Sequence, residues 1–145
     1  MEDLEMAKER LRNGNLGLSI VKDGRVIYES ASRGLFGLLD AIESQKAILK
    51  GASVADRVVG KSVALLCVYV KVKMVYAITL GREAKAVLDY HAVCNEFDGL
   101  VDAILDIDHA NTCPFEQLVA GISSPRVAYE KIRVLCQHLQ REDRQ

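Results

Sequence analysis

The stretch that decides the fold is GASVADRVVGKSVALLCVYV, residues 51–70. Its first part, Ala52 to Ala55, predicts a short strand. Its second part, Val58 to Val70, is rich in Ala, Leu and Val and predicts a buried helix. A strand that leads directly into a helix is the repeating unit of an α/β domain. The stretch therefore predicts a strand-to-helix turn at residues 56–61.

The rest of the chain continues this alternation in both directions. Before the stretch, the sequence predicts a charged helix at 2–12, strands at 16–21 and 25–28 joined by a hairpin turn at Asp23-Gly24, and a helix at 35–49. After it come a strand at 73–79, a helix at 82–90, an extended segment at 92–97, short helices near 99–106 and 114–121, and a helix from Pro125, capped by Ser124, to about Leu139. The order predicts a three-layer α/β/α domain with a mixed sheet.

Length and composition agree with this class. The chain has 145 residues, of which 50% are hydrophobic and 27% are charged, so we expect one domain over 1–145, with an N-terminal helix within 1–14 and a C-terminal helix and frayed tail within 122–145. The net charge of −1 argues against a nucleic-acid polymer as partner. The longest apolar stretch, Val63 to Val70, is too short to span a membrane.

The cysteines and the N-terminus predict the compartment. The four cysteines at 67, 94, 113 and 136 are widely spaced, and residues 1–5 are acidic rather than the basic start of a signal peptide. These features predict free thiols and a cytoplasmic location.

The turn at residues 56–61 is the first candidate site. A helix that begins after a strand presents unpaired backbone N–H groups, which favour an anion. Gly60 permits a close approach of the backbone, Lys61 supplies a mobile positive charge, and Asp56 is placed to bind a ligand hydroxyl or base. With Ser62, these residues predict a site for a phosphate or carboxylate. In the alternative interpretation, Asp56 only caps the helix and Lys61 pairs with it or lies in solvent.

A phosphate loop is a sharper interpretation of the same residues. Ala55 to Ser62 fits the loose pattern A-x-x-x-x-G-K-S between a predicted strand and helix. Bulky Val58 and Val59 stand where such a loop needs small residues, and the strand at 73–79 lacks an Asp to hold magnesium. Nucleotide binding of this type is therefore the weaker hypothesis.

Cys113 is the second candidate. Pro114 suits the first position of a helix, which places Cys113 at the N-cap, where the helix dipole favours the thiolate. A nucleophilic or ligand-contacting thiol and a buried structural cap are both compatible with this position. Glu116 stands where it can bond back to the cap, and His109 is the nearest histidine.

A one-sided charge distribution is the third feature. No Lys or Arg lies between Lys85 and Arg126, whereas seven Asp and Glu do, so this block carries −7 and the remainder of the chain +6 (−1 minus −7). On the helix predicted near 99–106, Asp98, Asp102 and Asp106 would share one side, next to Asp108 and His109. No known metal-loop spacing is present, and we expect no bound metal. The opposed charges also suit association of two copies.

Four segments resemble those of one known family. They are KDGRVIY at 22–28, SRGL at 32–35, VADRVVGKSVALL at 54–66 and CPFE at 113–116. In this order they resemble a prokaryotic family with a cytidine-deaminase-like fold and no established activity, over roughly residues 15–120. Zinc deaminases hold their metal with H-x-E or C-x-E and P-C-x-x-C words. At the corresponding positions this chain has Arg33-Gly34 and residues 55–59, so the resemblance implies the fold without the zinc site. Cys94-Asn95-Glu96 spells C-x-E, but no C-x-x-C follows it.

The resemblance implies a pocket at the carboxyl ends of the strands. We expect a small anionic ligand there, such as a nucleotide or modified base, held by Asp56, Lys61 and the amides near Gly60, with Arg33 assisting. If there is chemistry, Cys113 and Asp56 are its candidate groups, with no cofactor; the sequence does not decide whether a reaction occurs. The alternative is a non-catalytic regulatory or assembly domain that forms a homodimer.

Overall fold

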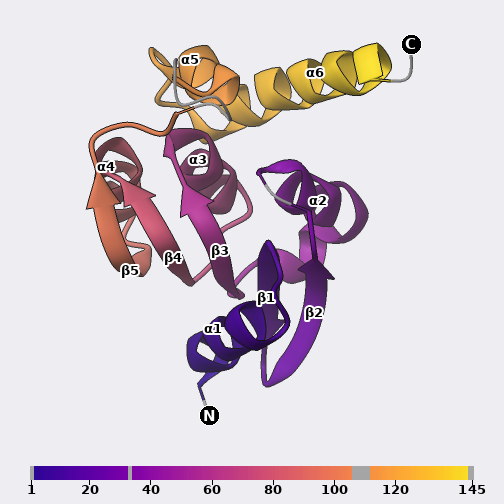
Figure 1. Cartoon of the computed structure of the whole chain (residues 1–145), viewed down its shortest axis with the longest axis vertical. Coiled ribbons are helices and arrows are strands. Elements are labelled where there is room, and N and C mark those ends of the chain that lie inside the picture. The colour runs from indigo at the N-terminus through magenta and orange to yellow at the C-terminus, as the bar shows by residue number, and fades with distance from the viewer. Residues whose placement is uncertain (1, 33, 106–111, 144–145) are drawn as a thin grey trace.

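A five-stranded mixed sheet forms the centre of the protein (Figure 1). The computed structural model describes residues 2–32, 34–105 and 112–143. The strands lie in the order β2-β1-β3-β4-β5; β1 is antiparallel to both of its neighbours, and β3, β4 and β5 are parallel. Their bounds are β1 (Leu18–Lys22), β2 (Arg25–Ser30), β3 (Ser53–Val59), β4 (Met74–Gly81) and β5 (Cys94–Val101).

Helices cover both faces of this sheet, which confirms the predicted three-layer α/β/α class (Figure 1). One face carries α1 (Asp3–Asn13). The other carries α2 (Phe36–Leu49), α3 (Lys61–Tyr69) and α4 (Arg82–Tyr90), and α5 (Pro114–Val119) and α6 (Pro125–Asp143) pack against α3. The main hydrophobic core lies between the sheet and the helices of this second face, and a smaller cluster that includes Leu4, Leu11 and Tyr76 lies beneath α1.

Tyr76 joins α1 to the sheet. Its side chain is buried, and its hydroxyl accepts a hydrogen bond from Arg12 at 2.8 Å and donates one to Asp98 at 2.7 Å. The ammonium group of Lys8 lies 4.8 Å from the ring centroid and also pairs with Glu96 at 2.9 Å. Residues from α1, β4 and β5 thus form one polar network around a buried ring.

Removing the Tyr76 hydroxyl should weaken this network. We expect Tyr76→Phe to lower the free energy of unfolding by about 1 kcal/mol, because Arg12 and Asp98 would each lose one hydrogen bond while the ring would keep its packing. Urea unfolding measures the change, with Tyr90→Phe as control because the Tyr90 ring is 85% exposed. Equal stability of Tyr76→Phe and the wild type would show that the network contributes nothing.

Two predicted elements differ in the structure. The short helix predicted near 99–106 is wrong, because β5 continues to Val101 and pairs in parallel with β4 as far as Gly81. The spacing of its apolar residues suits a helix. Pairing with β4 also satisfies the backbone hydrogen-bonding groups, and this segment forms a strand. The helix predicted from Val58 begins at Lys61, because β3 continues to Val59.

The last helix begins as predicted and ends later. Pro125 is its first residue, and the hydroxyl of Ser124 accepts a hydrogen bond from the Val127 amide at 3.3 Å. The helix continues past Leu139 to Asp143, so part of the predicted frayed tail is helical.

Candidate functional site

The predicted turn at residues 56–61 is a strand end followed by a single cap residue. Gly60 is the N-cap of α3, and β3 fills the positions before it. Asp56 therefore lies inside β3, opposite Leu18 of β1 and Ala77 of β4, and does not cap the helix as one interpretation predicted. Because residues 55–59 are strand, no phosphate-binding loop precedes Lys61.

The N-terminus of α3 is occupied by a carboxylate of the protein itself. The backbone N–H groups of Lys61 and Ser62 donate to the two oxygens of Glu116 at 2.7 and 2.8 Å. Glu116 belongs to α5, so this contact joins α5 to the start of α3. A Cβ at Gly60 would overlap the carboxyl group, so the close approach expected at Gly60 is made by Glu116.

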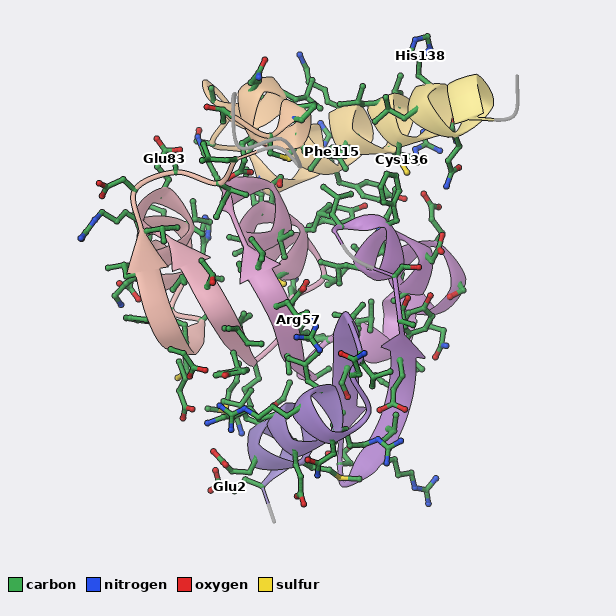
Figure 2. The ribbon with its side chains drawn as sticks, in the orientation of Figure 1. Glu2, Arg57, Glu83, Phe115, Cys136 and His138 are labelled. Atoms are coloured by element: carbon green, nitrogen blue, oxygen red, sulfur yellow. The ribbon has the colours of Figure 1, made fainter. Side chains whose placement is uncertain are left out.

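Phe115 packs beside this contact. It is buried, and its ring meets Phe36 of α2 edge-on, with ring centroids 5.9 Å apart. Figure 2 shows Phe115 on the side of α5 that faces the domain. Phe115 thus anchors α5 in the core next to the residue whose carboxylate occupies the start of α3. An external anion could reach the Lys61 and Ser62 amides only by displacing the Glu116 carboxylate. The predicted ligand roles of Gly60, Ser62 and Glu116 require this displacement and stay predictions.

Asp56 is a buried carboxyl group. It is 3% exposed, and its Oδ2 has no hydrogen-bond partner within the described part of the chain. Burial raises its pKa to about 7, against the opposing effect of the backbone amides of Arg57 and Val58. Burial also raises the pKa of the Cys67 thiol, and the charge of Asp56 contributes to that shift. Asp56 thus lies in the core near Cys67 of α3, and within the described residues no hydrogen bond or ion pair joins it to Lys61.

Lys61 itself lines an open groove. Its ammonium group donates to the carbonyl of Ala120 at 3.3 Å. The groove has a volume of about 550 Å³ and runs along α4 to the turn before α6. We call it the Lys61 groove; its lining includes Lys61, Glu83, Val87, Tyr90, His91 and Ser123.

A second, smaller cavity adjoins this groove. Its volume is about 270 Å³, and it lies where β4 ends and α4 begins, beneath α5. We call it the β4–β5 cavity; its lining includes Gly81, Glu83, Asp102, Thr112, Glu116 and Gln117. Glu83 lines both spaces, and Figure 2 shows it at the end of α4 nearest to α5. The β4–β5 cavity thus borders the carboxyl ends of two parallel strands, as expected for an α/β sheet, and shares Glu83 with the Lys61 groove.

Cys113 is the N-cap of α5, as predicted. Its carbonyl accepts hydrogen bonds from the Glu116 and Gln117 amides, its side chain makes no capping hydrogen bond, and its half-buried sulfur packs against the main core. Glu116 bonds to α3 and not back to this cap. His109 lies outside the described residues, and the catalytic role of Cys113 stays a prediction.

The acidic block does not form one helical face. Asp98 lies in β5 beside Tyr76 and Arg12, whereas Asp102 follows β5 and pairs with Arg82 at 2.6 Å. Asp106 and Asp108 lie outside the described residues, as does Arg33. Among the residues that the structure describes, no three His, Cys, Asp or Glu side chains gather to hold a metal ion. Cys94 and Glu96 of the C-x-E word lie on β5, where Glu96 pairs with Lys8.

Apart from Lys61, the sequence did not single out the residues that line the Lys61 groove. Glu83 and Val87 are four residues apart in α4, and Tyr90 ends that helix. The available signal was an apolar and aromatic series on a helix that is otherwise polar. Nothing in the sequence showed that α4 and the turn before α6 would border Lys61 together.

Fold and site together describe an α/β/α domain with a cavity at the carboxyl ends of its parallel strands and a groove along α4. Residues 6–135 match the model of a family described as "TM1506: Domain of unknown function (DUF1893)", and the chain belongs to this family. This result confirms the family resemblance seen in the sequence. No curated protein matches the chain.

Two solved structures are similar. The crystal structure of a DUF1893 family protein (TM1506) from Thermotoga maritima matches with a TM-score of 0.82 and 26% identity, over 94% of this chain and 89% of that one. RibD from Acinetobacter baumannii matches with a TM-score of 0.48 and 19% identity, over 66% of this chain and 34% of that one. The first similarity extends over nearly the whole domain; the second is too weak to support an argument about activity.

Two predictions about the protein's surroundings can be set beside the structure. Within the described residues, no helix combines the length and hydrophobicity that a membrane span requires. The cytoplasmic location and the association of two copies stay predictions.

Proposed function

We propose that the protein binds a small organic acid, with a carboxylate or phosphate group, in the Lys61 groove. The proposal rests on one observation: Lys61 lines an open groove of about 550 Å³ and makes no ion pair within the described residues. A volume in this range suits a small molecule. The Lys61 ammonium group keeps N–H donors for an acidic ligand, because within the described residues its hydrogen bond is a long one, 3.3 Å, to the Ala120 carbonyl.

Three further features of the groove support this proposal. The Ser123 hydroxyl lies in the same lining as Lys61 and can donate to an acidic group. Val87 provides an apolar surface, and Tyr90 an exposed aromatic ring. This combination of a few polar groups with an apolar surface is typical of small-molecule sites. Asp56, which the sequence predicted to hold the ligand, is not included in this proposal, because its side chain is buried.

A thermal-shift experiment tests the proposal. Nucleoside monophosphates, sugar phosphates and 3-phenylpropionate serve as probes, since a ligand that binds the folded state raises the melting temperature. We expect at least one probe to stabilise the wild type and to lose that effect in Lys61→Met, which removes the charge and keeps the apolar stem. Lys50→Met is the control, because Lys50 is exposed at the far end of α2. Probes that bind Lys61→Met as well as the wild type, or a panel without any stabilising probe, would contradict the proposal.

A further inference from the structure

The Lys61 groove carries two opposite charges that do not pair with each other. Lys61 and Glu83 both line it, and neither forms an ion pair in the described ranges 2–32, 34–105 and 112–143. Other carboxylates near this end of the sheet are engaged: Asp102 pairs with Arg82, and Glu116 accepts from the α3 amides. Glu83 is therefore a carboxylate still available to a ligand.

Glu83 lies beside the groove near the N-terminus of α4. It is in the first turn of α4, where the helix dipole favours a negative charge. A ligand that carried only a negative charge would gain from Lys61 and be repelled by Glu83. A ligand that carried both charges would satisfy both side chains, so the groove discriminates in its favour.

The other end of the groove is apolar and aromatic. Val87 is half-buried, and Tyr90 at the end of α4 is 85% exposed. The Tyr90 and His91 rings meet in a T-shaped contact, with centroids 5.0 Å apart, and the exposure of Tyr90 leaves its ring accessible for stacking. A flat or aliphatic group can lie here while the charged groups of the same molecule face Lys61 and Glu83.

We infer that the ligand is a zwitterion of the α-amino acid type. Its acidic group faces Lys61 and Ser123, its amino group faces Glu83, and its side chain covers Val87 and Tyr90. This inference rests on the proposed function, because it uses the same groove, and it adds the chemical class of the ligand.

Three probes of similar shape separate the contributions of the ligand's two charged groups to binding. Phenylalanine carries both, 3-phenylpropionate lacks the amino group, and phenethylamine lacks the carboxylate. Titration calorimetry on the full chain should give phenylalanine an affinity about tenfold higher than that of either analogue, since each missing charge leaves one side chain of the groove unsatisfied.

Matched variants assign each charge to its side chain. Glu83→Gln should lower the affinity for phenylalanine to that for 3-phenylpropionate and should not weaken 3-phenylpropionate. Lys61→Met should weaken both acids. Glu130→Gln is the control, because Glu130 is an exposed glutamate of α6 whose partner is Arg126. Circular dichroism confirms that each variant is folded.

The outcomes separate this inference from the proposed function. If 3-phenylpropionate binds as tightly as phenylalanine, and Glu83→Gln changes neither, the zwitterion inference is wrong and the Lys61 groove still binds an acid. If phenylalanine shows no binding at millimolar concentration while other acids bind in a Lys61-dependent way, the zwitterion inference is also wrong and the proposed function stands. If no acid binding depends on Lys61, both the inference and the proposed function fail.

Discussion

Replacing Asp56 by Asn should change the pH dependence of stability more than any other single substitution. The free energy of unfolding of Asp56→Asn, relative to the wild type, should rise by roughly 4 kcal/mol between pH 4 and pH 8. The physical reason is that the wild type must either keep a proton on a buried carboxyl group or leave an ionised oxygen without a partner, whereas the amide is neutral at every pH.

The sign of this effect follows from the direction of the shift. The folded-state pKa of Asp56 is raised from 3.8 to about 7, so between these values the folded protein binds a proton that the unfolded chain has released. The wild type therefore loses stability as pH rises from about 4 to about 7. Above pH 7, ionisation of Asp56 causes no further loss. Well below pH 3.8 both states are protonated, and the effect of the substitution there reports only hydrogen bonding and packing.

Urea unfolding of both proteins from pH 4 to pH 8 measures the difference directly. Asp40→Asn is the matched control, because Asp40 is an exposed carboxylate on α2. A stability difference between Asp56→Asn and the wild type that stays constant over this range would show that the Asp56 carboxyl group is not held in its protonated form.

Local sequence signals predicted the fold well where they agreed with the long-range contacts. Asp23-Gly24 joins β1 and β2, Pro125 begins α6, and the apolar helix after β3 packs in the main core. The segment after Phe97 was wrongly predicted to be a helix. Its local spacing suits a helix but gives no information about the edge of β4, which is open to pairing with another strand. Pairing of β5 with that edge determines its structure.

The candidate site was predicted less well, because its contacts join residues that are far apart in the sequence. Lys61, Gly60 and Glu116 were each singled out, but Glu116 was expected to bond back within α5 and bonds 55 residues away to Lys61. Asp56 was expected at an open strand end and is buried. A sequence shows which residue types can bind an anion, but it does not show which part of the chain itself already supplies that anion.

The contact of Gly60 with Glu116 leads to the second large effect. Glu116→Ala should lower the free energy of unfolding by about 2–3 kcal/mol, because two backbone N–H groups at the start of α3 would lose a charged acceptor. Gly60→Ala should cost a similar amount, because its Cβ would displace the carboxylate. Urea unfolding measures both. Glu130→Ala, an exposed substitution on α6, is the control.

The double variant tests whether both substitutions act on this one contact. Once Glu116 is Ala, the space beside Gly60 is free, and Gly60→Ala should add little further loss, so the two effects should be far from additive. Acetate or sulfate should then raise the melting temperature of Glu116→Ala more than that of the wild type, because a small anion can replace the missing carboxylate at the helix N-terminus. Additive losses without rescue by either anion would mean that Glu116 stabilises α5 alone and that the start of α3 has no capacity for an anion.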